Sequence, residues 1–327
     1  MNDHMSPNGG MTLASLSLDL DNQWSYMKTH GDSGWEKFPS YFDIFVPSIL
    51  DLLDQLKLKI TFFVVGQDAA LQKNKDALQQ IIKRGHEIGN HSFHHEQWIH
   101  MYSKDQLRSE VLEAENHILK VSGQKPVGFR GPGFVWSRDL FEILIENGYL
   151  YDATTLATYL GPLARLYYFW TSELTKKEKA KRKKLFGNLK DGLRPVKPYL
   201  WLLPSGNRFL EIPVTTIPII KTPFHLSYLL YLSRYSESLM RSYLRLALFF
   251  CRITRTSPSF LLHPLDFIGP DDVPELSFFP GMDLSKEHKT KIFKYVIKRL
   301  SHRFHLVNMS THAEYAIKNK NLKTIKT

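Results

Sequence analysis

The sequence predicts an α/β fold built on a parallel sheet or a barrel, and three observations support this prediction. Short runs of β-branched and aromatic residues alternate with amphipathic stretches of helical period, which is the pattern of repeated βαβ units. The run Ile60–Val65 is apolar at almost every position, as in a parallel strand buried on both faces. Acidic, histidine and arginine residues follow several predicted strands, and active groups of such folds gather at the carboxyl ends of strands.

Local patterns place the individual elements. Alternating apolar and polar residues predict a first strand over Thr12–Leu20. Ser103 and Gln106 have the spacing of a capping box, which predicts the start of a helix that ends at Gly123. Further strands are expected at Ile60–Val65, Val127–Arg130, Tyr149–Asp152, Leu200–Leu203, Phe209–Pro213 and His305–Asn308, and further helices at Phe42–Leu56, Asp76–Arg84, Arg138–Glu146, Ser227–Ile253, Lys286–Leu300 and Thr311–Lys318. Asn22–Ser40 is expected to be a long aromatic loop, and Asn319–Thr327 a frayed polar tail.

The composition is that of a globular protein with an acidic partner. The 327 residues are 43% hydrophobic and 23% charged, which argues against wholesale disorder and allows one large domain or two ordinary ones. The net charge of +11 favours nucleic acid, an anionic membrane surface or a phosphorylated substrate as partner. Cys251 is the single cysteine, which excludes a disulfide within the chain and fits a reducing compartment. Met1–Met11 has no apolar signal-peptide core, so we expect an intracellular protein.

The stretch Asn90–Glu96 contains three histidines within five residues. His91 and His95 are four residues apart, so one turn of helix would place both imidazoles on one face, where they could share a divalent metal. The alternative is a solvated polar turn that happens to be rich in histidine. A third ligand from elsewhere in the chain would decide between them.

Asp19 and Asp21 lie two residues apart at the end of the first predicted strand, so their carboxylates would project from the same face. Two neighbouring carboxylates repel each other unless a metal or an arginine lies between them. The alternative is an acidic strand end that leads into a polar loop. In the aromatic loop that follows, Trp24 and Trp35 would either stack on a sugar ring or pack the loop against the protein, and packing is slightly favoured.

The chain resembles the polysaccharide deacetylases, the NodB-homology group of carbohydrate esterase family 4. The resemblance rests on four elements in the family's order: Leu18–Asp21, His91–His95, Phe129–Gly133 and Leu261–Pro264. It implies a distorted (β/α)7-type barrel over residues 1–327, with a large helical insertion at about 157–256. It also implies a metal-dependent hydrolase that removes the N-acetyl group from an amino sugar of a polysaccharide or glycolipid precursor.

The resemblance further implies a role for each matching residue. Asp21, His91 and His95 would bind a divalent metal ion, most often zinc, with an open position for water. Asp19 would be the general base, Arg130 would hold it ionised, and His263 would protonate the departing amine. A backbone N–H near Gly133 would help to stabilise the oxyanion, while Trp24 and Asp152 are expected near the substrate.

Two departures from the family's pattern leave alternatives open. The family's first motif usually has adjacent aspartates, whereas Leu20 separates Asp19 from Asp21, so the roles of these two acids could be exchanged. The usual Asp-Trp motif is missing after Asp152, so either Asp152 or Asp266 would support His263. Rival functions are a deformylase or other amide hydrolase on a lipid-linked sugar, a metal-independent ureide hydrolase, and an inactive carbohydrate-binding relative.

The expected insertion carries much of the positive charge. Leu163–Trp170 is aromatic and amphipathic, Lys176–Lys184 is strongly basic, and Arg234, Arg241, Arg245 and Arg252 form one stripe if Ser227–Ile253 is a continuous helix. Such a helix would either lie in an anionic membrane interface or pack on the barrel with its charges in water. We therefore expect a cytoplasmic protein, and the first of these two alternatives would give it a peripheral contact on the inner membrane face and a lipid-linked sugar substrate. Nucleic-acid binding ranks well below, because no binding module is recognised.

Overall fold

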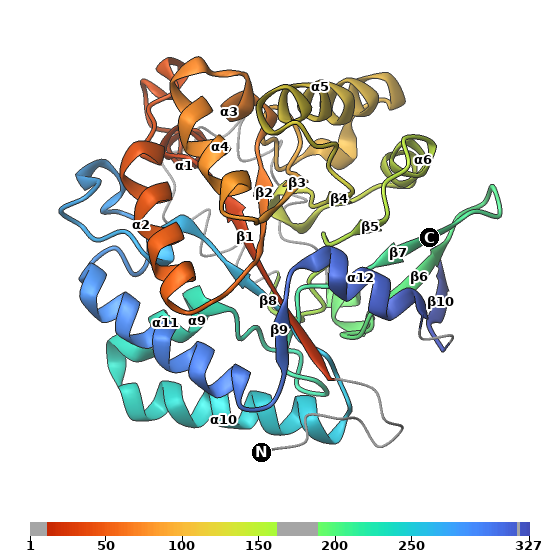
Figure 1. Cartoon of the computed structure of the whole chain (residues 1–327). Helices are drawn as coiled ribbons and strands as arrows, with labels where there is room; N and C mark the ends of the chain where they lie inside the picture. The colour runs from red at the N-terminus through yellow and green to blue at the C-terminus, as the bar shows by residue number, and fades with distance from the viewer. Residues whose placement is uncertain (1–11, 162–188, 319–320) are drawn as a thin grey trace.

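A mostly parallel β-sheet forms the centre of the molecule (Figure 1). The computed structural model describes residues 12–161, 189–318 and 321–327. Within these ranges the sheet contains β1 (Leu13–Leu20), β2 (Thr61–Val64), β3 (Glu87–Asn90), β4 (Gly128–Phe129), β5 (Tyr151–Asp152), β6 (Tyr199–Leu202), β7 (Arg208–Glu211), β8 (Ser259–Leu262), β9 (His305–Val307) and β10 (Lys323–Lys326). The strand order is β10-β6-β7-β5-β4-β3-β2-β1-β8, with β9 paired to β1 and only β6–β7 antiparallel. The predicted α/β class with a parallel sheet is confirmed.

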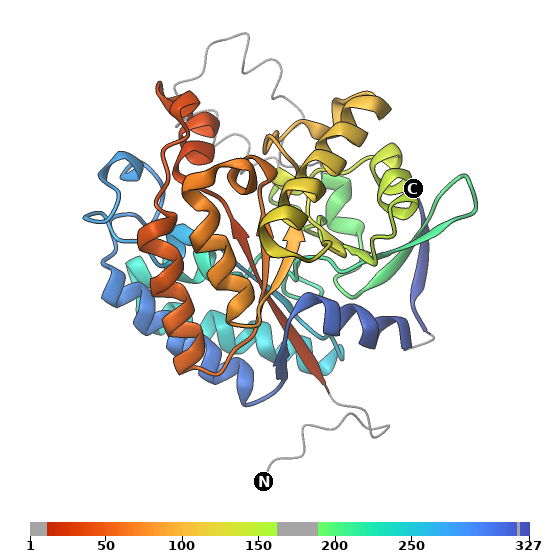
Figure 2. The same ribbon diagram turned by 45° about the horizontal axis from the view of Figure 1, so that its top comes forward.

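Helices surround this sheet on the outside (Figures 1 and 2). They are α1 (Gln23–His30), α2 (Phe42–Gln55), α3 (Gly66–Ala70), α4 (Lys75–Lys83), α5 (Lys104–Ser122), α6 (Arg138–Glu146), α9 (Leu226–Tyr235), α10 (Glu237–Ile253), α11 (Lys286–Ser301) and α12 (Met309–Lys318). The predicted capping box opens α5: Ser103 accepts a hydrogen bond from the Gln106 N–H, and the Gln106 side chain accepts one from the Ser103 N–H. Gly123 ends α5 in the left-handed conformation.

The segment after β7 links the β5 side of the sheet to the edge strand β8, although the sheet does not close through regular pairing. The chain after β7 continues beside β5, where the N–H of Ile212 donates to Asp152 O at 2.8 Å. It then reaches β8, where the N–H of Thr215 donates to Ser259 O at 3.0 Å and the N–H of Ser259 donates to the Thr215 hydroxyl at 2.7 Å. These bonds bridge the two sides of the sheet, which gives the arrangement the shape of a distorted barrel with an irregular seam.

The strand register aligns the residues that matter for function. Leu20 pairs with Val64, Val64 with Asn90, Asn90 with Phe129, and Phe129 with Asp152. Because these positions form one row at the carboxyl ends of β1 to β5, the residues that follow the row come out side by side. They include Asp21 after β1, His91 after β3 and Arg130 after β4. Parallel pairing therefore assembles polar groups that are far apart in sequence.

Three predicted segments differ from the structure. Residues 22–40 contain α1, which Asn22 caps by accepting from the Gln23 N–H, so they are not only a loop. The C-terminal tail forms β10, which pairs with β6 because its alternating side chains suit an edge strand. The helix expected over Ser227–Ile253 is interrupted at Ser236, whose backbone is extended and whose side chain caps α10, so Arg234 lies on a different helix from the other three arginines.

Two sequence predictions lie outside the described residues, namely the aromatic segment Leu163–Trp170 and the basic block Lys176–Lys184. In the described part of the expected insertion, β6 and β7 join the main sheet, and α9 and α10 bury Leu229, Leu230 and Met240 in the largest hydrophobic core. Among the described helices, none combines the length and the apolar character that crossing a bilayer requires.

Candidate metal and catalytic site

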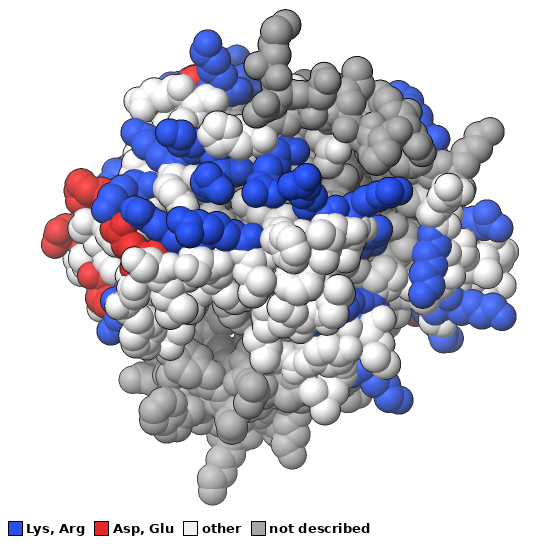
Figure 3. Space-filling model, turned by 90° about the horizontal axis from the view of Figure 1, so that it is seen from below, with Lys and Arg blue, Asp and Glu red and all other residues white. Residues whose placement is uncertain are grey.

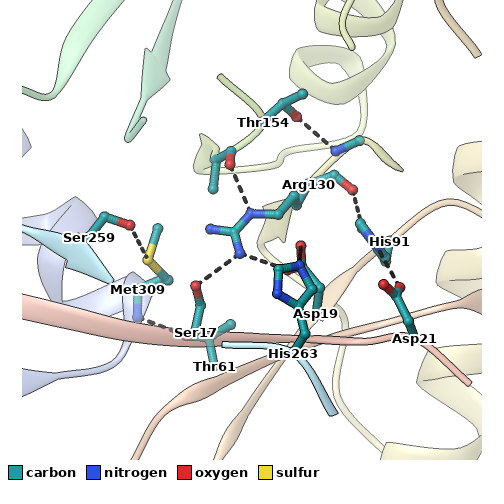
Figure 4. A network of polar contacts seen from close by, with 12 residues as sticks. Ser17, Asp19, Asp21, Thr61, His91, Arg130, Thr154, Ser259, His263 and Met309 are labelled. Atoms are coloured by element: carbon teal, nitrogen blue, oxygen red, sulfur yellow. Dashed lines mark hydrogen bonds and ion pairs between the residues drawn. The ribbon is translucent and has the colours of Figure 1, made fainter. Parts of the chain in front are cut away.

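Asp21, His91 and His95 form a buried group that could hold a metal ion (Figure 4 shows Asp21 and His91). One ligand atom of each residue lies within 4.8 Å of the others. Asp21 Oδ1 is 3.0 Å from His95 Nε2 and 3.5 Å from His91 Nε2. The three atoms therefore face a common point, and Asp21 is the candidate for the third ligand that the histidine cluster required.

The hydrogen bonds of the group fit a cation at this point. His91 Nδ1 is 2.6 Å from the carbonyl oxygen of Arg130, and since a carbonyl can only accept, Nδ1 carries the proton. In the neutral imidazole His91 Nε2 is then a bare acceptor that faces the oxygen of Asp21, and Asp21 Oδ1 has no hydrogen-bond donor among the described residues. Acceptors that face each other are favourable only with a cation or a proton between them, and a carbonyl that accepts from the other ring nitrogen commonly orients a metal-binding histidine.

The electrostatic interactions within the Asp21–His91–His95 group favour an ionised Asp21 and a protonated His91. Burial acts to raise the pKa of Asp21, but His95 and His91 outweigh it and hold that pKa well below its usual range. Burial acts to lower the pKa of His91, but Asp19 and Asp21 outweigh it and raise that pKa above its usual value. The site therefore stabilises positive charge next to ionised carboxylates, which also favours a bound cation.

The two histidines are not on one turn of helix, so that part of the sequence prediction is wrong. Residues 91–96 form an irregular loop in which Ser92 (φ 60°) and His95 (φ 55°) adopt left-handed backbone conformations. The loop stays in place because Asn90 Oδ1 accepts from the Ser92 N–H and Glu110 Oε2 accepts from the N–H groups of Phe93 and His94. Uncommon backbone conformations of this kind cluster at functional sites, where surrounding contacts enforce them.

His94 lies outside the group. Its Nδ1 is 2.6 Å from Glu110 Oε1, and about half of its side chain is exposed to solvent. Burial acts to raise the pKa of Glu110, but its contacts with His94 outweigh this effect and lower the pKa. Glu110 was not singled out in the sequence, because nothing in the period of α5 marks a glutamate that reaches a loop sixteen residues away.

Asp19 forms a second centre with Arg130 beside the first (Figure 4). Arg130 Nη1 donates to Asp19 Oδ1 at 2.7 Å and to the Ser17 hydroxyl at 2.9 Å, while Nε donates to Ala153 O at 2.8 Å. The guanidinium also lies over the ring of Phe63, with 4.3 Å between Cζ and the ring centroid. These contacts fix the orientation of the Asp19 carboxylate and leave its other oxygen facing His263.

His263 follows β8 and reaches this second centre from the other side of β1. Its Nε2 is 4.0 Å from Asp19 Oδ2, and its Nδ1 is 3.3 Å from the Ser227 hydroxyl. Of the two acids considered as its support, Asp266 is the neighbour: Asp266 Oδ2 accepts from the His263 N–H at 2.9 Å.

Asp152 lies elsewhere, so its expected place beside the substrate or His263 is not what the structure shows. Asp152 is buried, and its carboxylate accepts hydrogen bonds from the N–H and the hydroxyl of Thr154. Burial and the neighbouring carboxylate of Glu211 hold the pKa of Asp152 well above its usual range. This acid is therefore part of the barrel interior.

Trp24 and Gly133 have different outcomes. Trp24 is only 1% exposed, and its Nε1 donates to Asp68 at 3.0 Å. The ring therefore packs α1 against the protein and has no exposed face on which a sugar could stack. Gly133 lies three residues after Arg130 in a left-handed conformation (φ 66°), where a Cβ would approach Gln97 to 3.3 Å. That conformation favours glycine, and the role expected for a backbone N–H near it stays a prediction.

Two further buried polar residues lie near the site and were missed in the sequence. His225, just before α9, has its ring centroid 6.0 Å from that of His263, and its Nδ1 has no partner among the described residues. Burial, with His263 and Arg130 nearby, lowers the pKa of His225 to about 3, so the ring is neutral. Asp68 accepts from the side chains of Asn22 and Trp24, and burial raises its pKa to about 7. Both come from segments with no recognisable motif.

Comparisons with known proteins relate part of the chain to polysaccharide deacetylases. The family model described as polysaccharide deacetylase matches residues 32–151, a range that contains His91, His95 and Arg130. The chain is 34% identical to a peptidoglycan-N-acetylglucosamine deacetylase of Bacillus cereus over 105 residues, which are 32% of this chain and 47% of the relative. It is 26% identical to a peptidoglycan deacetylase of Helicobacter pylori over 144 residues, 43% of this chain and 48% of the relative. The chain thus spans about half the length of these curated relatives.

Two solved structures share the fold over nearly the whole chain. A protein from Mycobacterium smegmatis described as a polysaccharide deacetylase has a TM-score of 0.56 and 18% identity, covering 95% of this chain and 94% of that chain. The structure described as Puue allantoinase has a TM-score of 0.56 and 16% identity, covering 94% and 91%. At these identities the likeness concerns the fold alone.

Proposed function

We propose that this chain, which the polysaccharide deacetylase family model matches over residues 32–151, hydrolyses the N-acetyl group of an N-acetylated amino sugar with the help of a divalent metal ion. The observation that carries the proposal is the convergence, at one end of the sheet, of the Asp21–His91–His95 group with the Asp19–Arg130 pair and His263. A ligand group, a base held by a cation and a separate acid are the parts that metal-assisted amide hydrolysis needs.

Each residue has a chemical task in this proposal. A divalent metal held by Asp21, His91 and His95 would lower the pKa of a bound water and polarise the acyl carbonyl. Asp19 takes the proton of the attacking water, and Arg130 orients its carboxylate through a contact of 2.7 Å. His263, on the far side of Asp19, gives a proton to the nitrogen of the departing amine, so that the products are a carboxylic acid and a free amino sugar.

The geometry supports Asp21 as the ligand and Asp19 as the base, in preference to the exchanged roles. Asp21 Oδ1 faces both imidazoles, at 3.0 and 3.5 Å. Asp19 is bonded to Arg130 through Oδ1 and faces His263 through Oδ2. An aspartate already bound to a buried guanidinium is a poorer metal ligand, because part of its charge is neutralised.

The finer parts of the proposal are zinc as the metal, acetyl as the acyl group and a cytoplasmic protein that acts on a lipid-linked sugar. The printed names of the relatives, which are deacetylases of peptidoglycan and chitooligosaccharide, support an N-acetylated sugar. The rivals are a deformylase or other amide hydrolase on a lipid-linked sugar, a metal-independent ureide hydrolase and an inactive carbohydrate-binding relative. They differ in the acid released, in the metal requirement and in turnover, so one set of assays separates them.

The test is metal content and acid release for the wild type and the double variant His91→Ala/His95→Ala. About one metal per chain is expected in the wild type and none in the double variant, with acetate released from N-acetylglucosamine oligomers only by the wild type. His94→Ala is the matched control, because this neighbouring histidine pairs with Glu110 outside the group. An active wild type without metal would overturn the proposal in favour of the ureide hydrolase. Formate without acetate would favour the deformylase, and sugar binding without turnover would favour the inactive relative.

A further inference from the structure

One helix shows apolar side chains on both of its faces. α10 buries Met240, Leu244, Ala247, Leu248 and Cys251 against the core. On the opposite side Leu239, Leu246, Phe249 and Ile253 are 49%, 42%, 51% and 53% exposed. Their spacing of seven, three and four residues puts these four on one side of the helix. A helix that only covers a barrel would have polar residues there, so this stripe requires another explanation.

Basic side chains accompany the exposed stripe. Arg245, Arg252 and Arg255 are exposed, and none of them forms an ion pair within the described ranges of the chain. Arg241, by contrast, pairs with Glu237 at 2.8 Å and lies over the ring of Tyr295 on α11. The three other arginines therefore keep their charge available, and they lie on or directly after the helix that carries the apolar stripe.

The neighbouring helix adds to this charge. Lys291 of α11 pairs with Glu237 of α10 at 2.6 Å, which places the two helices side by side. Lys294 and Lys298, further along α11, are exposed. Figure 3 views the molecule from below, the side on which α10 lies in Figure 1, and shows a band of Lys and Arg with Asp and Glu gathered at one end of it. This face is therefore both basic and, along α10, apolar.

We propose that α10 docks the protein on an anionic lipid surface. Leu239, Leu246, Phe249 and Ile253 enter the boundary between headgroups and acyl chains, and Arg245, Arg252 and Arg255 bind lipid phosphates. Arginine suits this place because its planar guanidinium binds phosphate in a bidentate way. A nucleic acid would use the arginines but would gain nothing from four exposed aliphatic and aromatic side chains, which favours lipid as the occupant.

The position of α10 gives the docking a consequence for the site. α9 starts next to His225, whose ring centroid is 6.0 Å from that of His263, and it runs into α10 with only Ser236 between them. A helix of this length spans roughly 15 Å at about 1.5 Å per residue. α9 therefore connects the docking helix to the His225 side of the site, while the carboxyl ends of β1 to β3, which lie at the opposite end of the molecule from α10 in Figure 1, face away from the lipid. The inference depends only on the surface of α10 and α11, so its failure leaves the hydrolase proposal intact.

The experiment is co-sedimentation of the full chain with vesicles of phosphatidylcholine alone or with phosphatidylglycerol added. The wild type is expected to sediment with the anionic vesicles and not with the neutral ones. Phe249→Ser/Ile253→Ser removes the apolar contact, and Arg245→Glu/Arg252→Glu reverses the charge. Each double variant should lower the bound fraction at least about ten-fold, because one removes two apolar side chains from the lipid contact and the other reverses two charges that face lipid phosphates.

The matched control is Leu119→Ser/Lys120→Glu on α5, which exchanges one exposed apolar and one exposed basic residue on a helix at the other end of Figure 1. It should bind vesicles like the wild type. Unchanged binding of Phe249→Ser/Ile253→Ser would overturn the docking mode and leave adsorption by charge alone. Absence of binding by the wild type would overturn the proposal entirely.

A second copy of the chain is the other occupant that the apolar stripe could take. Sedimentation velocity at micromolar concentration is expected to show a monomer without vesicles. A dimer that Phe249→Ser/Ile253→Ser dissociates would assign the stripe to a protein interface and overturn the lipid proposal. Thermal unfolding and acid release from a soluble N-acetylated sugar should be unchanged in all three double variants, which separates loss of docking from loss of folding or of catalysis.

Discussion

Arg130 and Asp19 form a buried ion pair across the interior of the sheet, with 2.7 Å between Nη1 and Oδ1 and side-chain exposures of 0% and 6%. The two residues are 111 positions apart in sequence, on β1 and directly after β4. Such a pair contributes little net stability when it is intact, but removing one partner leaves an uncompensated charge in a medium of low dielectric constant. Substitutions in this pair should therefore change the free energy of unfolding and the catalytic rate by different amounts, which can be measured separately.

The first prediction concerns stability. Arg130→Met should lower the free energy of unfolding by about 3 to 5 kcal/mol, because the Asp19 carboxylate stays buried without its cation. Adding Asp19→Asn should restore more than half of this loss, since the uncompensated charge is then gone. Urea unfolding of the two single variants and the double variant gives the coupling energy. Strict additivity of the single effects would mean that the pair is not the source of the loss.

The second prediction concerns catalysis by the same aspartate. Asp19→Asn should retain the metal, because the ligands are Asp21, His91 and His95. It should lower kcat by about 100- to 10,000-fold, the usual range for loss of a general base. Elemental analysis and acid release measure the two quantities on one preparation. Loss of the metal together with activity would exchange the roles assigned to Asp19 and Asp21.

The third prediction concerns the support of His263. Asp266→Asn should lower kcat about ten-fold or more with little change in KM or metal content, because Asp266 Oδ2 accepts from the His263 backbone N–H at 2.9 Å and helps to position the ring. Asp272→Asn is the matched control, as Asp272 makes a similar bond to the Gly269 N–H in the same region but does not contact His263. Equal effects of the two substitutions would indicate general damage to the segment. In that case Asp266 would have no specific positioning role.

The fourth prediction is a pH dependence of stability. His312 is buried against Ser15, and burial lowers the pKa of its imidazole from 6.5 to about 4. Between these values the unfolded chain binds more protons than the folded one, so stability falls as the pH drops from about 6.5 to about 4, by at most about 1.4 kcal/mol per pH unit. The stability advantage of the wild type over His312→Gln should therefore shrink through this window.

Urea unfolding at a series of pH values measures that advantage. The exposed His302 serves as control, because His302→Gln should give a difference from the wild type that does not vary with pH. A constant difference for His312→Gln as well would show that this imidazole does not titrate with folding.

The sequence determined those features that depend on neighbours along the chain. The apolar run around Phe62 and the capping box at Ser103 predict β2 and α5, because burial pattern and end signals are local. The order of motifs along the chain also predicts the residues of the site, since parallel strands bring their carboxyl ends to one edge. The short strands β4 and β5 were placed to within a few residues, as element ends are the least certain part of a local pattern.

Only the tertiary structure decided features that depend on contacts between distant segments. The histidine loop is not helical because Asn90 and Glu110 hold it in left-handed conformations, and the latter comes from another element. Asp266 lies beside His263 and Asp152 does not, which depends on how the chain turns after β8 and not on residue type. α10 has apolar residues on two faces, and its sequence does not say which of the two packs against the core. Only the tertiary structure shows which face is buried and which remains as the exposed stripe.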